Sequence, residues 1–123
     1  MKRMNVQSMT VEQLVERFIA IALDQDHALL MDQIAKFNRL FDLMIAVEDE
    51  LKARDGDQRQ ALLQLYEHPN AQVRLNAVKA TLAVAPEAAR EMLQIIADSK
   101  EYPQAGDAGM SIWNLERGVY KPT

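Results

Sequence analysis

The segment of residues 68–84 reads His68-Pro69-Asn70-Ala71-Gln72-Val73-Arg74-Leu75-Asn76-Ala77-Val78-Lys79-Ala80-Thr81-Leu82-Ala83-Val84. Pro69 disfavours a helical conformation in the residue before it, so an earlier helix ends at this point. Asn70 is among the best residues to cap the start of the next helix. The segment therefore predicts a turn at His68–Pro69 and a helix that begins after Asn70.

This predicted helix is apolar on most sides. Its apolar residues form two adjoining stripes. One stripe contains Val73, Ala77, Ala80 and Val84, and the other contains Leu75, Val78 and Leu82. Only Gln72, Asn76 and Lys79 form a polar strip. A helix that is apolar around most of its circumference is contacted on several sides. We therefore expect it at the centre of the molecule, with one side open.

Similar signals mark the helices before this segment. Thr10 and Gln13 form a capping-box pattern that starts a helix over residues 11–24. Asp26 is the expected cap of a second, longer helix that continues to about Ala53. The break Asp55-Gly56-Asp57 then precedes a third helix, which ends at the turn before Asn70.

Two further helices follow the central one. Pro86 suits the first turn of a fifth helix. A loop is expected over residues 99–106, after which Asp107 caps a sixth helix that Gly118 ends. No segment shows sustained alternation of apolar and polar residues, so no sheet is expected. The pattern predicts an all-α fold of about three helical hairpins, with a flexible leader over residues 1–9 and a single domain over residues 10–123.

Two resemblances refine this fold. Val73-Arg74, followed by Ala77 after a turn with Pro69, resembles the second helix of a HEAT-type repeat, which implies a HEAT-like α-α superhelix and a structural, bridging role for Arg74. A wider set of segments in this chain resembles a bacterial family catalogued as domain of unknown function twenty-nineteen. These segments are residues 10–15, 38–41, 68–74, 85–89 and 104–109. That resemblance implies a helical, HEAT-like protein without assigned chemistry. It also suggests an immunity or inhibitor protein.

The composition excludes several classes of function. The 123 residues contain no cysteine, which rules out disulfides and thiolate metal sites and suits a reducing cytoplasm. The net charge is -4, whereas nucleic-acid binding usually needs a basic face. The longest apolar run, residues 18–23, is far shorter than the roughly 20 residues of a membrane span. We expect a cytoplasmic protein that is not an enzyme, uses no cofactor or metal, binds a protein rather than nucleic acid, and does not bind a membrane.

The candidate binding residues lie on the polar strips of the second and fourth helices. They are Lys36, Arg39, Gln72, Asn76 and Lys79. If the hairpins stack, these strips form a shallow, mildly basic groove that favours an acidic protein partner. Asn38 is expected to be structural, and Trp113, the only tryptophan, is expected in the core. His27 and His68 have no partners at ligand spacing, so structural roles are expected for both.

The leading hypothesis is a non-catalytic protein-interaction module, in one version an immunity or inhibitor protein. Two alternatives stay open. A nucleic-acid-binding HEAT-like module would need Lys36, Arg39, Lys79 and Arg117 on one continuous surface. A small-molecule binder would need an apolar pocket between the second and fourth helices.

Overall fold

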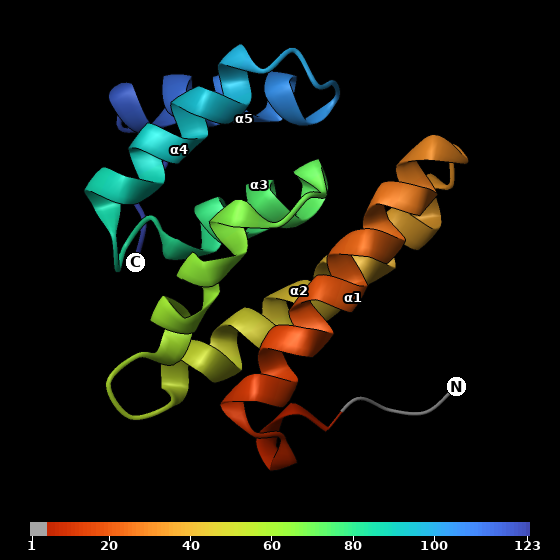
Figure 1. Ribbon diagram of the computed structural model, residues 1–123, viewed down its shortest axis with the longest axis vertical. Coiled ribbons are helices and arrows are strands. Elements are labelled where there is room, and N and C mark those ends of the chain that lie inside the picture. Colours follow the sequence, from red (N-terminus) through yellow and green to blue (C-terminus); the bar gives the residue numbers. More distant parts are fainter. Residues whose placement is uncertain (1–4) are drawn as a thin grey trace. The chain divides into compact units, whose positions relative to one another are not determined.

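The computed structural model describes residues 5–123, and Figure 1 shows that they are helical. The α-helices are α1 (Val11–Leu30), α2 (Ile34–Ala53), α3 (Ala71–Thr81), α4 (Pro86–Asp98) and α5 (Gln104–Glu116). Two 3-10 helices, η1 (Val6–Ser8) and η2 (Gln58–Glu67), complete the described part. No strand occurs in residues 5–123, so the expectation of an all-α fold is confirmed.

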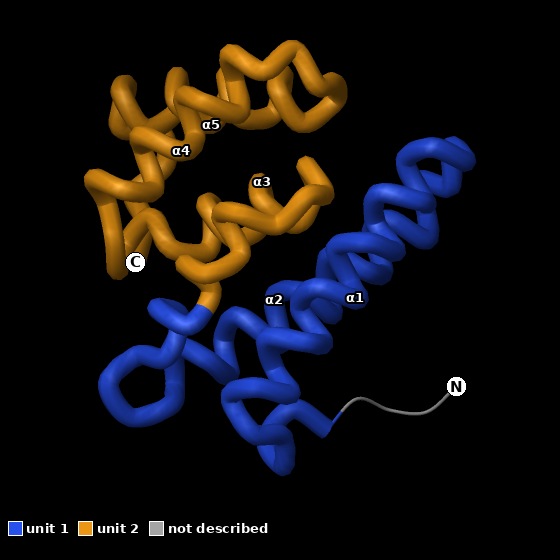
Figure 2. Tube along the Cα trace, in the orientation of Figure 1, with its two compact units in different colours: residues 1–61 blue, residues 62–123 orange. Residues whose placement is uncertain are grey.

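The chain divides into two compact units, residues 1–61 and residues 62–123, which Figure 2 distinguishes by colour. Unit 1 contains η1, α1 and α2. Unit 2 contains α3, α4 and α5. Both units lie largely within residues 10–123, the range that the sequence assigned to one domain.

Unit 1 is a hairpin of α1 and α2 (Figure 1). The α1 helix begins with the expected capping box, in which Thr10 and Gln13 exchange bonds of 2.9 and 3.1 Å. Buried apolar side chains line the facing sides of the two helices, and they are Leu14, Val15, Phe18, Ile21, Ala22 and Ala28 of α1 and Leu40, Met44, Val47 and Leu51 of α2. The helical spacing of these residues is what closes the hairpin.

The turn of this hairpin is not where the sequence placed it. The expected end at residue 24 and the cap at Asp26 are wrong, because α1 continues to Leu30. Nothing near residue 24 breaks a helix, and the side chain of Gln25 is buried on the inner face, only 1% exposed. The turn occurs at residues 31–33, where Asp32 adopts a left-handed conformation with φ of 56°. Aspartate tolerates that conformation better than most residues.

Residues 6–9 are held to the end of α2 by hydrogen bonds. The guanidinium of Arg54 donates hydrogen bonds to the carbonyl oxygens of Val6 and Met9, at 3.2 and 2.7 Å. Glu50 accepts a further bond from Arg54 at 2.6 Å. Residues 6–8 form the 3-10 helix η1 within the stretch that the sequence assigned to a flexible leader, and residues 1–4 of that stretch lie outside the described residues.

The third helix is a 3-10 helix over its whole length, which the sequence did not indicate. Its buried residues, Leu62 and Leu65, are three positions apart, the spacing that a 3-10 helix brings onto one side. Gly56 before it has a positive φ, 76°. Asp57 accepts a pair of hydrogen bonds from the Arg59 guanidinium, at 2.7 and 2.8 Å. The Arg59 side chain lowers the pKa of Asp57 mainly through this hydrogen bonding.

Unit 2 encloses α3 as the sequence predicted. Asn70 caps α3 by accepting hydrogen bonds from the backbone N–H groups of Gln72 and Val73. The core of the unit joins α3, α4 and α5, and its buried members are Leu75, Val78, Leu82, Ala89, Leu93, Ile96, Ala108 and Leu115. Ala77 is completely buried and Lys79 is exposed, which confirms the expected facing of this helix.

The last helix begins earlier than expected. It starts at Gln104, so the assignment of Asp107 as its cap is wrong. Gln104 and Ala105 are both buried, which draws the first turn of α5 onto the unit. Pro86 does occupy the first turn of α4, and Gly118 ends α5 with φ of 68°, as the sequence predicted.

Candidate functional site

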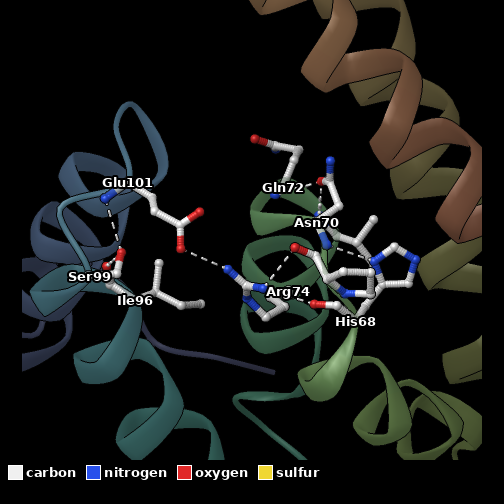
Figure 3. Close-up of polar contacts among 9 residues, drawn as sticks. His68, Asn70, Gln72, Arg74, Ile96, Ser99 and Glu101 are labelled. Carbon is white, nitrogen blue, oxygen red and sulfur yellow. Dashed lines mark hydrogen bonds and ion pairs between the residues drawn. The ribbon is translucent and has the colours of Figure 1, made fainter.

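Arg74 ties two turns of unit 2 together (Figure 3). Its guanidinium donates to the carbonyl oxygens of His68 and Pro69, at 2.9 and 3.1 Å, and to a carboxylate oxygen of Glu101 at 3.1 Å. The Arg74 side chain is 18% exposed. An arginine has five N–H donors in a fixed planar arrangement, so it can bind several acceptors at once. The bridging role implied by the HEAT resemblance fits these contacts.

His68 also has a structural contact. Its Nδ1 atom accepts a hydrogen bond of 3.0 Å from the backbone N–H of Asn70 (Figure 3). His27 is exposed in the last turn of α1. Within residues 5–123, no group of three or more acidic or histidine side chains is arranged to hold a metal ion.

A pocket of about 280 Å³ lies beside Arg74. Met92, Ile95 and Ile96 supply its apolar part, and Arg74 and Glu101 are among its polar residues. The guanidinium uses three of its five N–H donors for two carbonyls and a carboxylate.

The polar strip of α3 is used inside unit 2. Gln72 is only 5% exposed, so the expectation that it lines an open groove is wrong. Its amide donates to Asn76 at 3.0 Å and accepts from Gln104 of α5, also at 3.0 Å. Lys79 forms an ion pair of 3.0 Å with Asp107 of α5. The bonds of Gln72 and Lys79 with α5 join α3 to α5. The buried Gln72 amide needs such partners, because a buried polar group is stable only when it is hydrogen-bonded.

The other two candidate residues lie on a different unit. Lys36 and Arg39 are exposed on α2 of unit 1. Asn38, between them, is exposed as well. The structure thus divides the five candidate residues between the two units, with Lys36 and Arg39 in one and Gln72, Asn76 and Lys79 in the other.

The residue that the sequence misplaced is Trp113. It was expected in the core, yet it is 47% exposed on α5, while Ala108 and Leu115 occupy the inner side of this helix. The guanidinium carbon of Arg117 lies 4.1 Å from the centre of the Trp113 indole ring, which is a cation–π contact. Met110, one turn earlier, is 61% exposed.

Tyr102 extends this exposed row. A Cβ atom placed on Gly106 would lie 3.8 Å from the Tyr102 ring, so the ring covers that glycine, and Tyr102 is 71% exposed. We call Tyr102, Met110, Trp113 and Arg117 the Trp113 surface. Its residues recur with Gly106 at intervals of three or four, the spacing of one helix face. That spacing is the sequence signal that could have identified it.

Residues 5–123 contain no helix that is both long enough and apolar enough to cross a lipid bilayer.

Comparison with known proteins identifies relatives of this chain. Residues 12–116 match the family described as Domain of unknown function (DUF2019). The crystal structure of the protein RPA1889 from Rhodopseudomonas palustris CGA009 superposes with a TM-score of 0.95 and has 55% sequence identity. The match covers 98% of this chain and 100% of that one. No curated protein matches. Because the family match spans most of its length, this chain belongs to the DUF2019 family.

Proposed function

We propose that the protein is a non-catalytic protein-interaction module that binds an acidic protein partner through the Trp113 surface of α5. The observation that carries this proposal is the exposure of Trp113, 47%, beneath the guanidinium of Arg117. Tryptophan, tyrosine and arginine are the residues that most often dominate the affinity of protein interfaces. All three occur on this surface.

The glycines of α5 support contact with a partner. A Cβ atom on Gly109 would meet no atom of this chain within 4 Å. A glycine inside a helix costs about 1 kcal/mol relative to alanine, and no neighbour in the chain demands it here. Close approach of another polypeptide above Gly109 would explain the glycine, since Trp113 lies one turn further along the same side.

The charges near α5 favour an acidic partner. Asp107 is compensated by Lys79 at 3.0 Å, while Arg117 contacts an aromatic ring. A carboxylate of the partner could therefore bind Arg117 while an apolar group contacts Trp113. The immunity or inhibitor role suggested by the family resemblance is one form of such binding, and the cysteine-free composition suits a cytoplasmic location.

The HEAT-like organisation is part of this proposal. It is supported by Val73-Arg74 at the start of α3 and by the reach of Arg74 to both neighbouring turns. The nucleic-acid alternative receives less support, because Lys79 is already paired with Asp107 and the Arg117 guanidinium lies over Trp113.

The test is capture of a partner with tagged wild-type protein from a bacterium that encodes the chain, followed by identification and binding calorimetry with the purified partner. Trp113→Ala should weaken binding by about 2 kcal/mol or more, the typical loss at a dominant interface residue. Arg117→Glu should weaken it further, because it places an acid against an acidic partner.

Ile95→Ala is the matched control, since Ile95 is an apolar residue of unit 2 with a similar exposure, 55%. It should bind as wild type does. Equal affinity of wild type, Trp113→Ala and Arg117→Glu would show that the partner binds elsewhere.

A further inference from the structure

The turn after α2 contains the only place in the chain where an aspartate or an asparagine precedes a glycine, Asp55-Gly56. Both residues are exposed. The backbone N–H of Asp57 donates to the carbonyl oxygen of Arg54 at 3.0 Å, and Gly56 has a φ of 76°. A hydrogen-bonded turn in which only the second of the two central residues has a positive φ is a type II turn. The Asp55–Gly56 bond therefore lies in an exposed turn, outside both α2 and η2.

Two atoms decide the chemistry of this pair, the side-chain carboxyl carbon of Asp55 and the backbone nitrogen of Gly56. Among the residues that the structure describes, neither the Asp55 carboxylate nor the Gly56 N–H has a hydrogen-bond partner. A Cβ atom placed on Gly56 would meet only the Gln58 amide, at 3.9 Å, so no neighbour crowds this nitrogen. Glycine also adopts a φ of either sign at little cost. The chain can therefore rotate here and bring the nitrogen to the carboxyl carbon.

Asp57, in the same turn, differs from Asp55 in both respects. Arg59 donates to the two carboxylate oxygens of Asp57, at 2.8 and 2.7 Å. The residue after Asp57 is Gln58, whose side chain crowds its backbone nitrogen in a way that glycine does not. Asp57 is thus a matched control for Asp55 within the same molecule.

We propose that Asp55 is a site of spontaneous isomerisation to isoaspartate. The Gly56 nitrogen attacks the carboxyl carbon of protonated Asp55. The new C–N bond closes a five-membered succinimide ring, while the nitrogen loses its proton and the carboxyl group its OH, together as one water. Water then adds to one ring carbonyl and breaks the C–N bond of that carbonyl. Opening at the main-chain carbonyl leaves isoaspartate, whose backbone is one carbon longer, and opening at the side-chain carbonyl restores aspartate.

Gln58 restrains this reaction without touching the atoms that react. Its Nε2 atom donates to the carbonyl oxygen of Asp55 at 2.8 Å, which holds the Asp55–Gly56 peptide group in place. Ring closure requires this peptide group to rotate relative to the Asp55 side chain. The hydrogen bond from Gln58 opposes that rotation, so we expect its removal to speed the isomerisation.

Prolonged incubation of the full chain at physiological temperature, in water enriched in heavy oxygen, tests the site and the route. Each opening of the ring adds one heavy-oxygen atom to residue 55. Peptide mapping with electron-transfer fragmentation should find isoaspartate and the label at residue 55, and neither at Asp57. Circular dichroism checks that the protein remains folded. Absence of isoaspartate at residue 55, or equal amounts at residues 55 and 57, overturns the proposal.

Two substitutions of Asp55 test the succinimide. Asp55→Asn should react faster than wild type, because the side-chain amide loses ammonia more readily at neutral pH than the acid loses water, and its ring opens to the same two acids. Asp55→Glu keeps the charge but would need a six-membered ring, so labelling at residue 55 should be lost. An Asp55→Asn variant that reacts no faster than wild type, or an Asp55→Glu variant that is labelled as wild type is, overturns the succinimide route.

Gln58→Ala tests the restraint. Loss of the bond to the Asp55 carbonyl should raise the rate of isoaspartate formation several-fold. Gln60→Ala, at an exposed glutamine of the same helix, is the matched control and should react as wild type does. If Gln58→Ala reacts no faster than Gln60→Ala, the restraining role of Gln58 is overturned.

Discussion

The helices α2 and α3 use the same kinds of residue in opposite ways. In α3, the polar residues between the apolar stripes bond to other parts of unit 2: Gln72 with Gln104, Lys79 with Asp107 and Arg74 with Glu101. In α2, Lys36, Asn38 and Arg39 are exposed, and apolar Phe41, three residues after Asn38, is exposed as well. A polar strip next to an apolar stripe therefore has two outcomes, an internal link or an open surface.

The difference depends on what lies across from each helix. The polar strip of α3 faces α5, which supplies an amide at Gln104 and a carboxylate at Asp107. Such partners let a polar side chain be buried without losing its hydrogen bonds. We infer that the polar residues of α3 serve the fold, whereas those of α2 remain available to a partner. The following predictions test this contrast.

The largest effect is expected for a buried charge on α3. Ala77 has no exposed surface, so Ala77→Asp should destabilise the protein by several kcal/mol, on the order of 3 or more. The matched change on α2 is Ala35→Asp, at an exposed position near the helix start, where an acid is tolerated. Urea denaturation of both variants measures the contrast. Similar midpoints for the two would mean that α3 is not the enclosed helix.

Removal of the Arg74 link should have the next largest effect. Arg74→Ala deletes the bonds to two carbonyl oxygens and to Glu101, and it should cost about 2 kcal/mol of unfolding free energy. Glu101→Ala should cost less than 1 kcal/mol, because the Glu101 side chain is 56% exposed. Chemical denaturation compares the two variants. If Arg74→Ala is as stable as Glu101→Ala, the bonds from Arg74 to the two carbonyl oxygens do not stabilise the protein.

A smaller effect is expected at Tyr66, whose hydroxyl lies 2.6 Å from that of Thr81. Thr81 donates its own proton to the carbonyl of Ala77, so Tyr66 is the donor in this pair. Tyr66→Phe should therefore cost about 1 kcal/mol. The thermal midpoint at neutral pH measures this loss, with Tyr120→Phe, an exposed tyrosine, as the control.

The pH dependence of the Tyr66 variant sharpens the test. Burial raises the pKa of Tyr66 above its ordinary value of 10.0. The folded state then holds this proton more tightly than the unfolded state, so its contribution is complete below pH 10 and declines as the pH rises beyond it. Wild type should lose more stability than Tyr66→Phe between neutral and strongly alkaline pH. Parallel curves for the two would contradict this prediction.

The smallest effect is expected for Lys79. Its ion pair with Asp107 is 3.0 Å long, but both side chains are more than 40% exposed. An exposed pair contributes about 0.5 kcal/mol, so Lys79→Ala should change the unfolding free energy by no more than that. Lys36→Ala on α2 should leave the stability of unit 1 unchanged. A loss above about 1 kcal/mol for Lys79→Ala would mean that the ion pair is a major link between α3 and α5.

Local signals predicted much of the secondary structure. Thr10 and Gln13 form the expected capping box, Asn70 caps α3, and Pro86 occupies the first turn of α4. These signals work because the groups that they join are at most three residues apart. The wrong cap at Asp26 shows the limit: an aspartate can cap a helix, but here the apolar face continued past it and α1 did not end.

The sequence by itself determined that the protein is helical, where most of its helices begin, and that α3 is enclosed, because periodicity and capping are properties of neighbouring residues. Only the tertiary structure decided which polar side chains are available to a partner. Gln72 is buried because Gln104, 32 residues away in the chain, supplies its hydrogen bond. Trp113 is exposed because Ala108 and Leu115 already occupy the inner side of α5. The exposure of these two side chains depends on segments that meet only after folding, so local spacing indicates which residues share a helix face but not whether that face is covered.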